Sequence, residues 1–201
     1  MGWRMNLVAP SASALVAVLW LAACANQAPV ALSSQFSPPQ SQEWLESSSA
    51  GNSKSACRVR IAEVHDLRSD PQSMGLSGGR LVHSADTTAW IRSGFLSLGA
   101  DRRLQMTEDA APGDLTIDVD VLKAYAMNVT GETRAASVVL RVRYSRDGTP
   151  AGEQIYRGTQ NGLNWSSGEG ETQSSFDAAL ADLLKTVDSE LVARCAERRA
   201  Q

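Results

Sequence analysis

The sequence is poor in the residues from which metal centres and histidine-based active sites are built. It has two histidines and three cysteines among 201 residues, and neither histidine has partners at the spacing that metal ligation needs. It also lacks an excess of positive charge, because 19 Lys and Arg stand against 22 Asp and Glu, a formal net charge of -3. Nucleic-acid binding requires a concentrated cationic surface. We therefore expect no enzyme, no metal, no cofactor and no nucleic-acid partner.

Charge is almost absent from the N-terminal part of the chain, where Arg4 is the only charged residue before position 43. Residues 7–23 are nearly all apolar or small, a stretch too short for a comfortable membrane span and typical of a secretory signal. The stretch ends in the sequence LAAC, which resembles the bacterial lipobox. This resemblance implies that residues 1–23 are a lipoprotein signal peptide and that Cys24 carries a covalent diacylglyceryl lipid. The alternative is an ordinary secretory signal with an incidental cysteine.

The residue after Cys24 indicates which membrane would hold the protein. In enterobacteria-like systems, an aspartate at this position retains a lipoprotein in the inner membrane, and here the position is Ala25. We therefore expect a lipid anchor in the outer membrane, on its periplasmic face. More than one acyl chain gives firm attachment.

Residues 24–55 are rich in Ser, Pro and Gln and show no sustained apolar period. Such composition predicts a disordered, flexible tether behind the lipid anchor. Its typical reach would be roughly 30 Å. A single periplasmic domain is expected to fill residues 56–201.

Within this domain, apolar residues alternate with polar ones in four segments, which predicts half-buried strands. Two other segments have helical spacing: one is capped by Ser84 or Asp86 and closed by Gly99, and the other is an apolar stripe from Phe176 to Cys195. The predicted order is β-α-β-β-β-α. This order favours an α+β, two-layer sandwich, with a four-stranded sheet and both helices on one face. The strands are expected at 57–64, 115–121, 136–144 and 152–162, and the helices at 84–98 and 176–195.

Two cysteines remain once Cys24 is assigned to the lipid. The periplasm is oxidising, and the predicted topology brings Cys57, at the start of the first strand, to the same end of the domain as Cys195, near the end of the last helix. Both lie on apolar faces. We therefore expect a Cys57–Cys195 disulfide, which would constrain the unfolded chain by roughly 4–5 kcal/mol. The alternative is two buried free thiols.

Two local motifs could be read as sites. The sequence GLSGG at 75–79 matches the hydrolase nucleophile elbow, but a loop precedes it and no suitably placed histidine follows, so a glycine-rich loop is the better interpretation. Asp66, Arg68 and Asp70, beside His65, form a dense cluster of ionisable groups at a strand end. This cluster could bind a polar ligand or partner, or it could be paired internally and shape a turn.

A third group of charges lies on the polar faces of the predicted strands. Opposite charges on consecutive strands are expected to face each other across the sheet. This surface is either a solvated, self-neutralised face or a protein-docking face, for which Arg141 and Arg143 are the candidate contacts. The other members of the group are Arg58, Arg60, Asp118 and Asp120.

The chain resembles the YajG-type outer-membrane lipoproteins and, more distantly, the PqiC-type auxiliary lipoproteins of ABC and MCE transport systems. The resemblance rests on the lipobox, the Asp66-x-Arg68-x-Asp70 pattern, the 78–80 loop and the terminal amphipathic helix. The YajG type has no assigned activity, whereas the PqiC type implies docking onto a periplasm-spanning lipid-transport assembly.

We therefore expect a non-enzymatic, membrane-anchored periplasmic lipoprotein that acts as an accessory or docking module in envelope maintenance or lipid transport. The alternative is a small-ligand or lipid carrier with a groove between helices and sheet. Such a groove would be lined by residues such as Trp90, Phe95 and Phe176, which could equally fill an ordinary core. The sequence leaves the oligomeric state open.

Overall fold

A computed structural model describes most of the predicted domain and a short piece of the predicted tether. The predicted signal peptide (residues 1–23), Cys24 and Gly99 lie outside the described residues. The structure describes residues 28–39, 57–98, 103–129, 133–163, 165 and 168–197.

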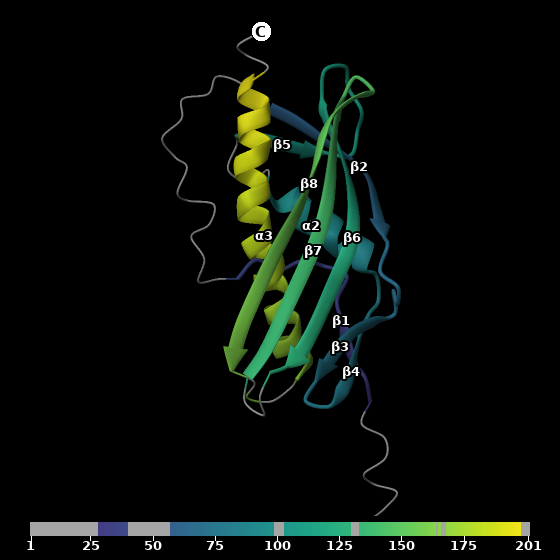
Figure 1. Ribbon diagram of the computed structural model, residues 1–201, viewed down its shortest axis with the longest axis vertical. Helices are drawn as coiled ribbons and strands as arrows, with labels where there is room; N and C mark the ends of the chain where they lie inside the picture. The colour runs from purple at the N-terminus through teal and green to yellow at the C-terminus, as the bar shows by residue number, and fades with distance from the viewer. Residues whose placement is uncertain are drawn as a thin grey trace, which may run out of the picture.

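The described residues form a curved, mixed sheet of eight strands with two helices packed on it (Figure 1). This corrects the prediction of a four-stranded sheet, although the fold contains both helices and strands as expected. No helix among the described residues is long and apolar enough to span a membrane. In chain order the elements are β1 (Val30–Leu32), β2 (Cys57–Asp66), β3 (Ser73–Ser77), β4 (Arg80–Ser84), α2 (Thr87–Ser97), β5 (Leu104–Thr107), β6 (Leu115–Asn128), β7 (Thr133–Arg146), β8 (Thr149–Leu163) and α3 (Glu169–Glu197).

The long strand β6 organises the sheet. On one side it pairs antiparallel with β7, which pairs antiparallel with β8. On the other side two different strands share its length: β2 runs parallel to its first half, and β3 meets its second half at Gly75 opposite Ala126. Beyond β2 lies β5, and beyond β3 lie β4 and then β1.

The four strands missing from the prediction are β1, β3, β4 and β5. They have three to five residues each, which is too short for a two-residue alternation to stand out from a loop. Each is held in place by pairing with a strand that is distant in the sequence or, for β3 and β4, by a tight hairpin with Gly78 and Gly79 at positive φ. Long-range pairing of this kind leaves no periodic signal in the chain.

One of these strands belongs to a segment that was predicted to be disordered tether. Val30 and Leu32 in β1 are buried, as is Phe36 after it, and β1 runs parallel to β4 with Val30 opposite Val82. Residues 28–39 are therefore part of the folded domain. Three apolar side chains in a polar segment were enough to fill places in the core.

The helices lie close to their predicted positions, although α3 begins at Glu169 and not at 176, and they cover the inner side of the sheet. Asp86 is the N-cap of α2, since its carboxylate accepts a hydrogen bond from the Ala89 N–H at 2.9 Å. The apolar stripe of α3 is fully buried against β7 and β8. At Gly158 in β8 a Cβ would collide with the Ala179 carbonyl of α3, so this close contact between strand and helix requires glycine.

A disulfide joins the first long strand of the domain to its last helix. Cys57 at the start of β2 and Cys195 near the end of α3 form a disulfide, with their Cα atoms 6.0 Å apart. The up-and-down course of the long elements brings these residues together, as the predicted topology required.

Candidate functional site

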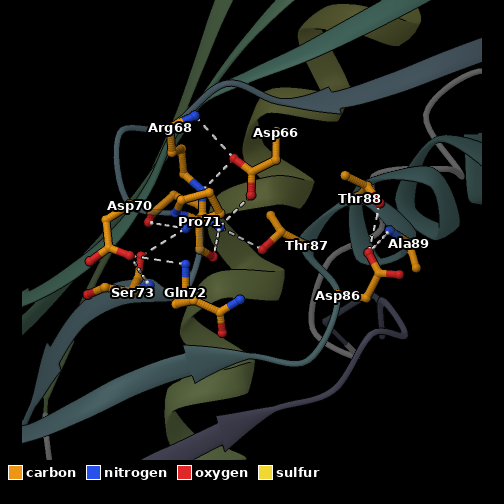
Figure 2. Close-up of polar contacts among 11 residues, drawn as sticks. Asp66, Arg68, Asp70, Pro71, Gln72, Ser73, Asp86, Thr87, Thr88 and Ala89 are labelled. Atoms are coloured by element: carbon orange, nitrogen blue, oxygen red, sulfur yellow. Dashed lines mark hydrogen bonds and ion pairs between the residues drawn. The ribbon is translucent and has the colours of Figure 1, made fainter.

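The cluster at the end of β2 is built around the Arg68 guanidinium (Figure 2). Its Nε and Nη2 atoms donate to the two carboxylate oxygens of Asp66 at 2.8 and 2.7 Å. Further N–H groups donate to the carbonyls of Ser73 and Pro71 and to the Thr87 hydroxyl, at 2.7–2.9 Å. Only 6% of the Arg68 side chain is exposed. This guanidinium therefore joins β2, the following loop, β3 and the start of α2.

Asp70 has a different role within this cluster. Its Oδ1 accepts hydrogen bonds from the backbone N–H groups of Gln72 and Ser73 at 3.1 and 3.2 Å, a local arrangement that shapes turns. Every N–H direction of Arg68 already has a partner inside the protein, and an anionic ligand could bind it only by displacing one. Of the two alternatives for Asp66, Arg68 and Asp70, the geometry favours internal pairing.

Asp118 and Asp120 on β6 and Arg141 and Arg143 on β7 lie on the outer side of the sheet, which neither helix covers. Asp118 faces Arg143 and Asp120 faces Arg141 in the strand register, as the alternation predicted. Both arginines converge on Asp120: Arg143 donates to its Oδ1 at 3.0 Å, and the Arg141 guanidinium lies 3.5 Å from its Oδ2. Asp120 is 1% exposed, whereas the arginines are 35% and 42% exposed.

This pairing fixes the two guanidinium groups on the surface. A buried carboxylate is stable only when it is paired, so Asp120 holds Arg141 and Arg143 against the sheet, where both side chains stay partly exposed. Next to Arg143 is a cavity of about 360 Å³, lined by Asp118, Pro150 and Glu153 among others. Ile155, which faces Arg141 on β8, is 58% exposed. We call Arg141, Arg143, Glu153 and Ile155 the outer-face patch.

The two arginines of β2 do not join this patch. The Arg58 guanidinium pairs with Asp114 at 3.2 Å, and Arg60 donates to the Glu108 carbonyl at 3.4 Å. Both contacts are on the β5 side of the sheet, because β5 extends the sheet beyond β2. The structure thus divides the six charged residues of the predicted face between two places.

Ser77, the serine of the GLSGG motif, is fully buried. Its hydroxyl lies 3.0 Å from the Thr172 hydroxyl and accepts a hydrogen bond from Arg134 at 3.1 Å. It is therefore a structural residue. The predicted glycine-rich loop is correct only for Gly78 and Gly79, because Gly75, Leu76 and Ser77 belong to β3. Arg134 itself was missed, although its place on the inward-facing register of β7 could have been read from the alternation.

Arg134 is the centre of a buried polar cluster between β3, β7 and α3. Besides Ser77 it donates to the Thr172 and Ser175 hydroxyls and to the Glu171 carbonyl, at 2.9–3.2 Å. Burial lowers the pKa of this guanidinium, and the Glu171 carboxylate opposes that shift. The arrangement holds the first turn of α3 against the sheet.

Asp177 in α3 is a second buried polar residue that sequence reasoning missed. Its Oδ1 accepts hydrogen bonds from the Trp90 indole at 2.8 Å and from the Gln173 amide at 3.0 Å. Burial raises the pKa of this carboxyl, and the bonds from Trp90, Gln173 and the Ser37 backbone oppose the shift. The residue connects α2, α3 and the N-terminal segment.

The raised pKa of Asp177 predicts a pH dependence of stability. The pKa of Asp177 is higher in the folded state than in the unfolded state. At neutral pH the ionised carboxylate therefore lowers the free energy of unfolding, and this cost is a penalty on stability. It is relieved as the pH falls through the folded value towards 3.8. Asp177→Asn keeps an acceptor for Trp90, so we expect its unfolding free energy to exceed that of the wild type at pH 7. Urea unfolding of both proteins between pH 7 and 4 should show the difference disappearing, and a constant difference would contradict the assignment.

The residues considered for a ligand groove lie in the hydrophobic core. Trp90, Phe95 and Phe176 are at most 2% exposed, and the rings of Trp90 and Phe176 meet edge to face with centroids 6.1 Å apart. These side chains fill the space between the helices and the sheet. This arrangement favours the ordinary-core alternative over the carrier alternative.

Comparison with known proteins places the fold but not the family. No protein-family model matches the sequence, and no curated protein matches it. Among solved structures, a DUF330-family protein from Xanthomonas campestris is similar, with a TM-score of 0.52 and 12% identity, covering 87% of this chain and 99% of that one. A minor lipoprotein from Acinetobacter baumannii gives a TM-score of 0.43 and 6% identity over 67% of this chain and 94% of that one. At 12% identity, the similarity to the Xanthomonas protein shows a shared fold and nothing more. The TM-score of the Acinetobacter protein is below 0.5, so that similarity adds nothing to this conclusion.

Proposed function

We propose that this chain is a non-enzymatic lipoprotein, anchored through Cys24 to the periplasmic face of the outer membrane. Its outer-face patch would dock a partner protein of a cell-envelope or lipid-transport assembly. The observation that carries the docking proposal is the pair of half-exposed arginines fixed on buried Asp120, in a sheet face without a helical cover. The resemblance to the PqiC type gives independent support for a transport assembly as the partner.

The patch has the composition of a protein-binding surface. Arginine is enriched at interface centres, and here the two arginines lie beside the exposed apolar side chain of Ile155 and a cavity. Because Asp120 already immobilises the guanidinium groups, a partner would order few additional side chains on binding. A carboxylate on the partner could accept hydrogen bonds from the exposed parts of these guanidinium groups.

The experiment is crosslinking and pull-down of the full-length lipoprotein from membranes. We expect wild type to recover a transport or envelope complex and Ile155→Asp to recover about tenfold less, as at a central interface residue. Ile155→Asp is preferable to Arg141→Glu with Arg143→Glu as the first variant, because reversing those charges leaves buried Asp120 unpaired. Leu96→Asp is the matched control, since Leu96 is 40% exposed on α2, outside the patch.

Two outcomes would overturn the docking proposal. One is recovery of no protein complex by the wild type. The other is equal recovery by Ile155→Asp and Leu96→Asp. Lipid that co-purifies equally with all three forms, without protein, would instead support the carrier alternative.

A further inference from the structure

We propose that the end of the domain formed by the β3–β4 hairpin rests directly on the membrane, with its exposed apolar side chains in the lipid interface. The proposal builds on the lipid anchor at Cys24 described under the proposed function. It differs from the expectation of a domain held at the end of a long flexible tether. The occupant of this surface is lipid, and a protein partner at the same end is an outcome of the test.

The described chain enters the domain beside the β3–β4 hairpin. Arg80, in the β3–β4 hairpin, donates from Nε to the Ala28 carbonyl at 2.8 Å and from Nη2 to the Pro29 carbonyl at 3.5 Å. From there β1 runs alongside β4. The beginning of the described chain is therefore fixed beside the hairpin, at the lower end of the domain in Figure 1.

The chain between Ala28 and the predicted lipid anchor at Cys24 is short. Three residues, 25–27, separate Cys24 from Ala28. Even a fully extended chain over this span reaches only about 14 Å. If Cys24 is lipidated, its Cα cannot lie farther than this from the Cα of Ala28, which Arg80 holds beside the hairpin, whereas the expected tether allowed roughly 30 Å.

The hairpin end of the domain is rich in exposed apolar side chains. Of the ten large apolar side chains that the described residues expose, six lie on the hairpin or on the adjoining ends of β6 and β8. Strand pairing places them together: Leu76 faces Leu81, and the Val129 N–H donates to the carbonyl of Thr133, which faces Leu163. The six are Leu76, Leu81, Met127, Val129, Leu163 and Trp165, and we call them the apolar end.

Trp165 is the most exposed of these residues, at 84%. Tryptophan is favoured at the membrane–water boundary, where its ring and its N–H meet different environments. At the disulfide end of the domain, residues 104–114 and 145–151 contribute none of the ten exposed apolar side chains. The exposed apolar surface is therefore concentrated at the end nearest the anchor.

Charge at the apolar end does not favour attraction to anionic lipid. Arg80 is engaged by the Ala28 and Pro29 carbonyls, and the first turn of α3 adds the acidic residues Glu169 and Glu171. Binding would therefore come from apolar contact, and it should be nearly independent of the anionic lipid content and of salt.

The test is tryptophan quenching of the full-length lipoprotein in phosphatidylcholine vesicles that contain lipids brominated near the headgroup. The Trp165→Phe variant isolates the contribution of Trp165, because the other tryptophans are common to both proteins. We expect about a twofold loss of the Trp165 emission in brominated vesicles, unchanged by added phosphatidylglycerol. As a second variant, a twenty-residue Gly/Ser insertion after Ala25 should reduce the quenching, because it frees the domain from the short connection.

The outcomes separate this inference from the proposed function. Acylation is measured independently, by the mass of the N-terminal peptide and by flotation with vesicles, against Cys24→Ser. An unacylated Cys24 would overturn both proposals. An acylated protein whose Trp165 is not quenched would overturn only the membrane contact. Crosslinking of Trp165 to a partner protein in membranes would overturn the membrane contact in the same way.

Discussion

Replacing Cys57 and Cys195 together by alanine is expected to lower the free energy of unfolding by about 4–5 kcal/mol. The bond joins residues separated by 138 positions, so it removes a large part of the unfolded chain's freedom. It also fixes the start of β2 to the last turn of α3. The measurement is equilibrium denaturation in guanidinium chloride, monitored by circular dichroism.

The control is the wild-type protein under reducing conditions, which loses the bond but keeps both sulfur atoms in place. Its stability should fall nearly as far as that of the double variant, because the bond matters more than the packing of two small side chains. A loss below about 1 kcal/mol in both cases would show that the unfolded chain is already constrained by other means.

Arg68→Ala is expected to destabilise the domain by about 3–5 kcal/mol. The substitution leaves the Asp66 carboxylate, 14% exposed, without its ion-pair partner. It also removes the guanidinium N–H groups that donate to the Ser73 and Pro71 carbonyls and to the Thr87 hydroxyl. Arg68→Lys should recover little of the loss, because an ammonium group cannot reproduce the planar fork of donors.

Arg92→Ala is the matched control for this prediction. Arg92 forms a surface ion pair with Glu108, and their side chains are 30% and 56% exposed, so its removal should change stability by less than about 1 kcal/mol. Denaturant unfolding of the three variants gives the comparison. Equal effects for Arg68→Ala and Arg92→Ala would show that the cluster at the end of β2 is not a structural centre.

The elements whose signal repeats along the chain could be predicted from the sequence alone. Strands β2, β6, β7 and β8 and the helices α2 and α3 are long enough for a period of 2 or 3.6 to emerge. The same alternation predicted that opposite charges on β6 and β7 lie opposite each other, as Asp120 and Arg141 do, because these strands are consecutive. The disulfide followed from the order and direction of these long elements, since both cysteines lie near the ends of predicted elements.

The assembly of the sheet and the roles of its charged residues could not be predicted in this way, because they depend on contacts between distant parts of the chain. The short strands and the division of one edge of β6 between β2 and β3 depend on hydrogen bonds between distant residues. Arg68 could be recognised as a structural residue only when Asp66, Pro71 and Thr87 were brought around it. In the same way, Val30, Leu32 and Phe36 are core residues because β1 pairs with β4, a strand distant in the sequence. Periodicity is a local property of the chain, whereas burial and pairing are properties of the assembled molecule.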